Sequence, residues 1–374
     1  MMKKAVVVLF GGLLCSCSTP DDSSDTSGSA QNSVDFDRAE MLAHWADNII
    51  LPAYADFSLQ LDQLETAADA FVDTPDIIQL AQLQEKWAMA YETWQKVSMF
   101  EIGPAETLNY RLQMNIYPVD RELIQSNILA DNYNLELPSN RVAKGFPALD
   151  YMLFGLAEQQ QEILILYVGE EGALRRAYLT SLVADMKSLH EQVLDGWENG
   201  YRDSFVSNDG SSSTASVDRF VNDFIYYYEK HLRAGKMGIP AGVFSGDVLL
   251  QNLEGCFHGS ISKRMFLVGL QATQDFFNGK AYASETYGPS LSAYLDALNV
   301  VKEGADLSAV INTQIDEARS EVQDLDPFKV ALQQNPPVDF LEAYDEVQRL
   351  VPLLKVDMVS ALSITIDFVD ADGD

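Results

Sequence analysis

The sequence contains few cysteines, and it has no long apolar run beyond its first residues. Only 3 cysteines occur in 374 residues, and Cys15 and Cys17 both lie close to the N-terminus. Cys256 is therefore alone in the rest of the chain, which excludes an intramolecular disulfide there, so the fold must depend on its apolar core. No later segment has the roughly 20 consecutive apolar residues that a membrane-spanning helix requires.

Basic residues are also scarce. The chain has 25 Lys and Arg against 56 Asp and Glu, a formal net charge of -31. Such a chain repels phosphate backbones and anionic lipid surfaces, which argues against a nucleic-acid partner. With 47% hydrophobic and 22% charged residues, its composition is that of an ordinary globular protein. The acidity attracts cations in general, but it does not by itself define a metal site.

The short motifs of common enzyme classes are absent as well. The sequence has no HExxH, no Walker loop, no GxSxG and no CxxC. Its histidines, His44, His190, His231 and His258, are scattered, and none has a second histidine at ligand spacing on the same helix. Cys256 and His258 point to different sides of a helix because they are two positions apart. Neither a histidine-based zinc site nor a Cys–His nucleophile is therefore predicted.

The N-terminus has the layout of a bacterial lipoprotein signal. A short cationic start precedes residues 5–14, an apolar run too short to span a bilayer. Small Ser16 comes directly before Cys17, whereas bulky Leu14 comes before Cys15. We predict that residues 1–17 are a signal peptide and that Cys17 is lipidated. An uncleaved anchor or an ordinary secretory signal is the alternative.

Residues 18–35 have the composition of a disordered tether. Residues 18–33 contain no large apolar side chain, so burial cannot offset the entropy lost on ordering them. Ser18 follows the predicted lipidation site, where no aspartate signals retention in the inner membrane. We therefore predict a lipid-anchored protein of the cell envelope, at the outer membrane and facing the periplasm.

From residue 36 onward, apolar residues recur at helical spacing and predict an all-α fold of helical bundles. Thr74 is predicted to cap a helix that has Pro75 at its first position. Residues 364–368 alternate, which predicts at most a short β element near the C-terminus. The clearest apolar stripes are Ile50, Tyr54, Phe57, Leu61 and Leu64, and Leu174, Tyr178, Leu182, Met186, Leu189, Val193 and Trp197.

Residues 207–216 are rich in Gly and Ser and resemble a linker. We divide the body there into two helical bundles, residues 36–206 and residues 207–374, although a long hairpin loop would have the same composition. Residues 110–145 contain prolines and asparagines and are predicted to form irregular structure with short helices.

Two segments concentrate glycine and proline beside aromatic and ionisable residues. They are residues 145–155, GFPALDYMLFG, and residues 233–246, RAGKMGIPAGVFSG. Glycine-rich stretches of this kind occur where a backbone approaches a ligand or another backbone closely. A capped core helix and a tight helix–helix corner are the structural alternatives.

The GFPALDYMLFG segment resembles the signature region of the imelysin-like family, bacterial envelope proteins that include insulin-cleaving membrane proteases and iron-regulated protein A-like lipoproteins. The resemblance covers nearly all of residues 37–374. It implies an all-helical fold of two bundle-like domains with a site at their interface. The other matching blocks are residues 94–97 with 102–104, Arg111 with residues 117–120, residues 236–242, and residues 362–368 with 372–374.

This chain departs from the family pattern Gly-x-His-x-x-Glu, which is proposed to bind metal. The corresponding residues are Gly145, Pro147 and Asp150. Proline offers no side-chain ligand, whereas a zinc peptidase needs about three protein ligands and a positioned base. The sequence therefore argues against peptidase activity and leaves open whether the chain is an enzyme.

The resemblance places the two segments on opposite walls of one cleft, suited to a small polar ligand, a chelated metal or a peptide. Asp150, Glu254 and His258 are the candidate ligands for a divalent metal or iron. The full set of ligand-binding candidates is Gly145, Phe146, Pro147, Asp150, Tyr151, Lys236, Pro240, Arg111 and Trp94.

The favoured hypothesis is a non-catalytic, lipid-anchored envelope binding protein that serves iron acquisition together with iron-uptake or other envelope proteins. A metal-dependent peptidase and a purely structural interaction protein are the alternatives.

Overall fold

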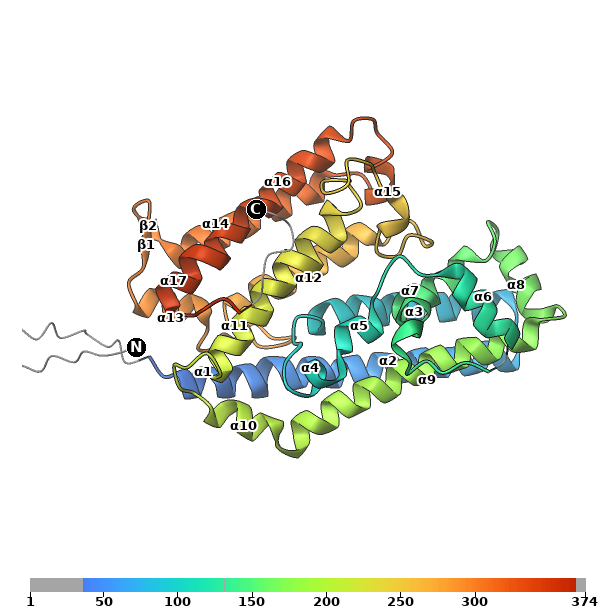
Figure 1. Ribbon diagram of the computed structural model, residues 1–374, viewed down its shortest axis with the longest axis horizontal. Helices are drawn as coiled ribbons and strands as arrows, with labels where there is room; N and C mark the ends of the chain where they lie inside the picture. The colour runs from blue at the N-terminus through green and yellow to red at the C-terminus, as the bar shows by residue number, and fades with distance from the viewer. Residues whose placement is uncertain (1–35, 131, 368–374) are drawn as a thin grey trace, which may run out of the picture. The chain divides into compact units, whose positions relative to one another are not determined.

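The computed structural model describes residues 36–130 and 132–367, and helices dominate this part of the chain (Figure 1). The strands within it are β1 (Val301–Lys302) and β2 (Ala305–Asp306), which pair antiparallel. The all-α prediction is therefore confirmed. The predicted signal peptide, the tether and Cys17 lie outside the described residues. Among the residues described, no helix has both the length and the apolar character needed to cross a membrane.

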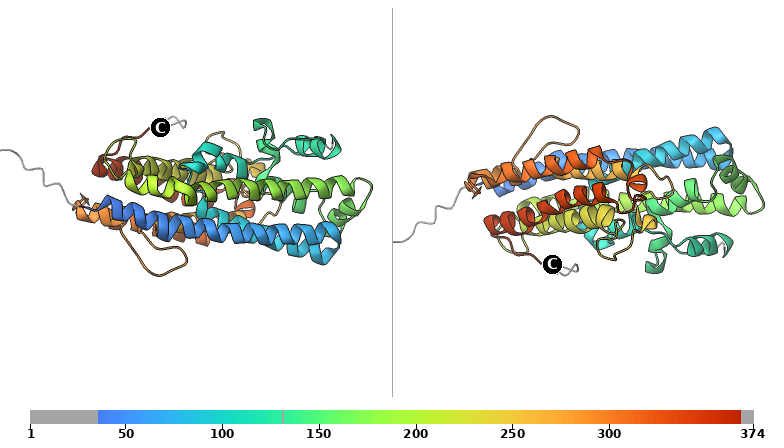
Figure 2. Two further views of the ribbon diagram at one scale, coloured as in Figure 1. Left: turned by 90° about the horizontal axis from the view of Figure 1, so that it is seen from below. Right: turned by 90° about the horizontal axis from the view of Figure 1, so that it is seen from above.

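The first part of the chain is organised around three long helices. Helix α1 (Arg38–His44), the π-helical η1 (Trp45–Ile50) and α2 (Leu51–Asp73) follow one another without a break. Helices α3 (Ile77–Val97) and α9 (Gly172–Gly196) both pack against α2, and Figure 2 shows α9 alongside it. These contacts bury the apolar stripe of α2, in which Tyr54, Phe57, Leu61 and Leu64 are all fully buried.

The start of α3 differs from the prediction. Asp76, not Thr74, is the N-cap, and its carboxylate accepts hydrogen bonds from the backbone N–H groups of Ile78 and Gln79. Thr74 instead follows the last turn of α2. The carboxylate of Asp76 satisfies two of the amides left without partners at the helix start, which fixes the first residue of α3.

Short elements connect α3 to α9, as predicted for residues 110–145. They are α4 (Pro104–Leu108), α5 (Tyr110–Met114), α6 (Arg121–Ala130), η2 (Pro138–Ala143), α7 (Gly145–Asp150), η3 (Tyr151–Gly155) and α8 (Gln160–Val168). After α9 come η4 (Trp197–Tyr201) and α10 (Arg202–Ser207). The Gly/Ser-rich stretch that follows α10 is a loop.

The second part begins with α11 (Ser216–Tyr226), which continues into the π-helical η5 (Tyr227–Gly238). Helices α12 (Ser262–Phe277), α14 (Leu307–Asp324) and α16 (Val338–Pro352) form the main packing, with α14 and α16 both long and adjacent. The remaining elements are η6 (Leu250–Asn252), α13 (Leu291–Ala297), α15 (Phe328–Ala331), η7 (Leu353–Met358) and α17 (Val359–Leu362).

Helix α12 packs against α3 and so joins the two parts. The ring of Phe276 lies 4.9 Å from Trp45 and 6.0 Å from Phe100 between centroids, and one hydrophobic core extends through both parts. From Phe36 onward the chain groups into one compact unit. The boundary between two bundles at residues 206 and 207 stays a prediction.

Residues 364–367 are not part of a strand. The side chain of Asn222 donates to the backbone oxygen of Thr365 at 3.0 Å and accepts from the N–H of Asp367 at 3.0 Å. A side-chain amide on α11 thus takes the place of a neighbouring strand, because it provides both a donor and an acceptor.

Candidate functional site

Both sequence segments singled out above contact one short turn, residues 254–258. The carboxylate of Asp150 accepts hydrogen bonds from the backbone N–H groups of Phe257 and His258, each at 2.9 Å. Asp150 is only 1% exposed. Burial, the largest influence, raises its pKa to about 7, whereas the two amides and Lys329 oppose the rise.

The path of α7 depends on Gly145 at its start. This residue has φ +70°, and a Cβ atom there would lie 2.2 Å from the backbone oxygen of Met114. Only glycine fits such a close approach in this conformation. The next residue, Phe146, stacks on Tyr91 of α3 with 4.4 Å between ring centroids and a 2° interplanar angle. This anchoring places Asp150, one turn later, over the 254–258 turn.

Lys236 of η5 holds the other end of the same turn. Its ammonium pairs with the carboxylate of Glu254 and donates to the Gln95 side-chain oxygen at 2.7 Å. The other carboxylate oxygen of Glu254 accepts from Asn115 at 2.7 Å and from Gln95 at 3.2 Å. Lys236 and Glu254 are 3% and 1% exposed, and burial lowers the pKa of Lys236 although Glu254 opposes this. The result is a buried ion pair whose oxygens are hydrogen-bonded.

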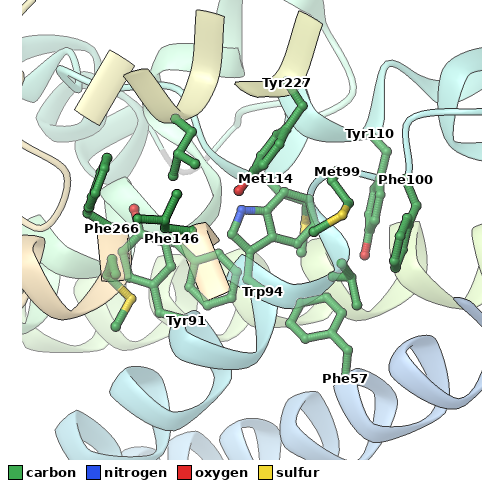
Figure 3. Close-up of a cluster of buried hydrophobic side chains, with 14 of the residues drawn as sticks. Phe57, Tyr91, Trp94, Met99, Phe100, Tyr110, Met114, Phe146, Tyr227 and Phe266 are labelled. Atoms are coloured by element: carbon green, nitrogen blue, oxygen red, sulfur yellow. The ribbon is translucent and has the colours of Figure 1, made fainter. Parts of the chain in front are cut away.

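A cavity of about 200 Å³ lies beside this ion pair, and Trp94, Arg111 and Lys236 all line it. Tyr227 and His231 of η5 contribute to the same wall. Figure 3 shows the hydroxyl of Tyr227 and the indole nitrogen of Trp94 pointing toward each other. Three of the predicted ligand-binding residues are therefore brought together.

The π-helical geometry of η5 explains how Tyr227 and Lys236 reach the same cavity. They are nine positions apart, which would place them on opposite faces of an α-helix with about 3.6 residues per turn. The wider π-helix, with about 4.4 residues per turn, brings them back to one face. The apolar periodicity of the sequence predicts an α-helix here, so it could not predict that these two side chains lie on the same face.

Arg111 occupies the wall between this cavity and a second one of about 360 Å³ that Asp223 and Glu101 also line. Its guanidinium contacts both oxygens of Asp223 at 3.0 Å and donates to the Ser98 backbone oxygen at 2.7 Å. Glu101 accepts from the backbone N–H of Arg111 at 2.7 Å. The guanidinium is thus fixed in place between the two cavities.

The stability of the protein is expected to depend on pH through Glu101. Burial, opposed by Arg111, raises the pKa of Glu101 from 4.5 to about 7. Between these two pH values the folded state keeps a proton that the unfolded state releases. The free energy of unfolding is therefore highest below pH 4.5, where the carboxyl is protonated in both states, and it falls as the pH rises to about 7. Glu101→Gln should gain about 3 kcal/mol of stability relative to the parent across this range.

Urea unfolding of both proteins at a series of pH values measures this difference. The raised pKa of Asp150 affects both proteins equally and cancels in the comparison. Stability curves that run parallel from pH 4 to pH 8 would show that Glu101 ionises normally.

The other predicted residues lie elsewhere. Phe146, Pro147 and Asp150 are buried, and they are not among the residues that line the 200 Å³ cavity. Tyr151 contacts Phe257 and faces a separate hollow along α6. Pro240 is buried in the turn after η5. Asp150 and Lys236 therefore meet the same turn from its two ends rather than across one open cleft.

The predicted metal ligands do not converge. Both oxygens of Asp150 accept backbone amides, and both oxygens of Glu254 are already paired. The His258 ring packs against Trp87 and Phe154. In residues 36–130 and 132–367, no three His, Cys, Asp or Glu side chains come together as a metal site would require. The residues at the positions proposed to bind metal in the family therefore do not fit a metal ion.

Gln95, Asn115, Ser98 and Tyr227 were missed by the sequence analysis. Gln95 directly follows Trp94, and Tyr227 ends an apolar stripe with a polar aromatic ring. Polar residues on otherwise apolar helix faces were the available signal, because buried polar groups require partners.

These features define an all-α protein in which helices from both parts of the chain enclose a small polar cavity. The chain belongs to the imelysin family, since the family model described as Imelysin matches residues 50–354. The predicted family resemblance is thereby confirmed.

Known relatives agree with this assignment. Iron-regulated protein A of Synechococcus elongatus is 25% identical over 126 residues, which cover 33% of this chain and 34% of the relative. The aligned part thus spans about a third of that relative's length.

Two solved structures share the fold. An imelysin-like protein from Psychrobacter arcticum has a TM-score of 0.68 at 17% identity, covering 88% of this chain and 97% of its own. A candidate iron-regulated protein A precursor from Parabacteroides distasonis has a TM-score of 0.71 at 16% identity, covering 87% and 95%.

Proposed function

We propose that this chain is a non-catalytic binding protein of the bacterial cell envelope, lipid-anchored at the outer membrane, which serves iron acquisition. Its ligand occupies the cavity bounded by Trp94, Arg111 and Lys236. The observation that supports this most directly is the cavity itself, where buried polar side chains from α3, α5 and η5 converge. Convergent polar groups in a concave site are typical of small-molecule binding.

The geometry around Asp150 supports binding over peptide hydrolysis. A general base must reach the proton it removes, but both oxygens of Asp150 hold backbone amides of the 254–258 turn. Pro147 stands where the family has its histidine and contributes no ligand. The role in iron acquisition rests on the name of the Synechococcus relative and on the predicted lipoprotein signal.

Three measurements test this function. The full chain, incubated with an unfolded protein substrate, should leave it intact with or without a chelator, and cleavage that a chelator abolishes would establish the peptidase alternative. A thermal-shift panel of anionic, neutral and cationic small molecules should contain at least one stabilising ligand whose effect Trp94→Phe weakens.

Deletion of the gene in the native bacterium should slow growth only when iron is withheld. Equal growth of the deletion strain and the parent strain without iron would contradict the role in iron acquisition.

The anchor is tested separately at Cys17. Cys17→Ala should prevent lipidation and either release the body in soluble form or accumulate the uncleaved precursor. Mass spectrometry of the native N-terminus decides the question. An unmodified N-terminus downstream of Cys17 in freshly isolated membranes would contradict the lipoprotein prediction, whereas the cavity and its ligand would be unaffected.

A further inference from the structure

The charged side chains that line the 200 Å³ cavity are basic, in contrast to the acidic composition of the chain as a whole. The protein carries 56 acidic residues against 25 basic ones. Yet Arg111, Lys230 and Lys236 line this cavity, and none of the described residues in its wall is acidic. Asp223 and Glu101 pair with Arg111, and Glu254 pairs with Lys236. These acids lie outside the wall of this cavity. Cationic groups therefore face the cavity, and their counter-charges lie behind them.

Several donors in the wall remain available to a ligand. The indole N–H of Trp94 is buried and has no acceptor in the described part of the chain. Two N–H groups of Lys236 donate to Gln95 and Glu254, and the described residues offer no acceptor for the third. Arg111 uses its Nε and one terminal nitrogen, and no acceptor for Nη1 is found among residues 36–130 and 132–367. Among the residues that the structure describes, the hydroxyls of Tyr227 and Ser98 have at most each other as partners.

A buried donor without a partner destabilises the protein because it has given up its hydrogen bond to water, so a cavity lined by several such donors favours a ligand rich in acceptors. A carboxylate has about four lone-pair sites and no donor when ionised. The pKa of His231, which lines the same cavity, shows the local charge: burial lowers it most, and Arg111 and Lys236 lower it further.

We infer that the cavity binds a small organic anion, a carboxylate whose oxygens accept from the indole of Trp94 and from Lys236 and Arg111, with its apolar part against Tyr227 and Tyr117. This inference rests on the proposed function and specifies its ligand class. The cavity volume of about 200 Å³ restricts the ligand to compounds smaller than those that fill the usual drug-sized pockets of about 300–1,000 Å³. The ion pairs behind Lys236 and Arg111 hold both cations in place before the anion arrives, which reduces the entropy lost on binding.

Matched acids and amides test the charge requirement. The full chain in a non-ionic detergent is titrated by calorimetry with benzoate and succinate, and with benzamide and succinamide as neutral counterparts of the same shape. At least one carboxylate should bind about tenfold or more tightly than its amide, as expected for charge-assisted hydrogen bonds. An amide that binds as tightly as its acid, or four compounds that all fail to bind, would overturn the inference.

Variants locate the site. Trp94→Phe removes the indole N–H and leaves a smaller aromatic ring, and it should weaken carboxylate binding about fivefold or more. The double variant Lys236→Met/Glu254→Gln removes the cation without leaving a buried acid unpaired, and it should weaken binding about tenfold or more. Lys96→Met is the control because Lys96 lies on the same helix as Trp94 but lines a different cavity. Its affinity should equal that of the parent.

The outcomes separate this inference from the proposed function. Carboxylate binding that survives both Trp94→Phe and the double variant would place the anion elsewhere and overturn the inference. A neutral ligand that Trp94→Phe displaces would overturn the anion class while the binding function stands. If no compound in the thermal-shift panel or the titrations binds, both the inference and the proposed binding function are contradicted.

Discussion

Lys236→Met should lower the free energy of unfolding by about 3–5 kcal/mol, because it leaves the carboxylate of Glu254 buried without its cation. Glu254 is 1% exposed and would retain only the neutral donors Gln95 and Asn115. Chemical unfolding monitored by circular dichroism measures the loss. We expect a lower midpoint with an unchanged slope, since the surface exposed on unfolding stays the same.

The double variant Lys236→Met/Glu254→Gln is the matched control. It removes both charges together, and replacing a buried ion pair with neutral groups is often close to neutral for stability. We therefore expect it to recover most of the loss. Two single substitutions whose effects simply add would show that Lys236 and Glu254 do not interact, because residues in contact couple.

Asp150→Ala should lower the free energy of unfolding by about 2–4 kcal/mol, because the amides of Phe257 and His258 lose a charged acceptor. Both residues are half-buried, so water replaces only part of what the carboxylate provides. The 254–258 turn should also open more readily, which hydrogen exchange at these two amides would reveal as faster exchange.

An exposed helix cap is the control for Asp150. Asp120 accepts from the N–H of Leu123 at 2.9 Å at the start of α6 and is exposed. Asp120→Ala should cost about 0.5–2 kcal/mol, as losing an ordinary cap does. If Asp150→Ala costs no more than Asp120→Ala, the carboxylate is not what holds the turn. A large loss combined with unchanged ligand binding would support the structural reading of Asp150.

The helices could be predicted because their signals are local. The stripe of Tyr54, Phe57 and Leu61 repeats every three to four positions, and burial of that face follows directly from the spacing. The N-cap of α3 was placed two residues too early because Thr74 and Asp76 are both good capping residues. Only the backbone conformation shows that the side chain of Asp76 reaches the free amides.

Part of the candidate site could also be predicted from the sequence. Trp94, Arg111 and Lys236 were predicted as ligand-binding residues through the family resemblance, and they line one cavity. Gln95 and Asn115 were not found, since their partner Glu254 is more than a hundred positions away. Spacing along a helix indicates that a polar residue is buried, but it does not identify the residue that faces it.

The sequence by itself determined the helical class, the buried faces and the replacement of the family histidine by Pro147, because composition, periodicity and residue identity are properties of the chain alone. Only the tertiary structure decided that Asp150 and Lys236 hold opposite ends of the 254–258 turn instead of sharing one cleft. It also decided that η5 is π-helical, which puts Tyr227 and Lys236 on one face. The first depends on hydrogen bonds between separate segments, which form only when packing brings the segments together. The second depends on hydrogen bonds from residue i to i+5 within η5, which the apolar spacing along the chain does not reveal.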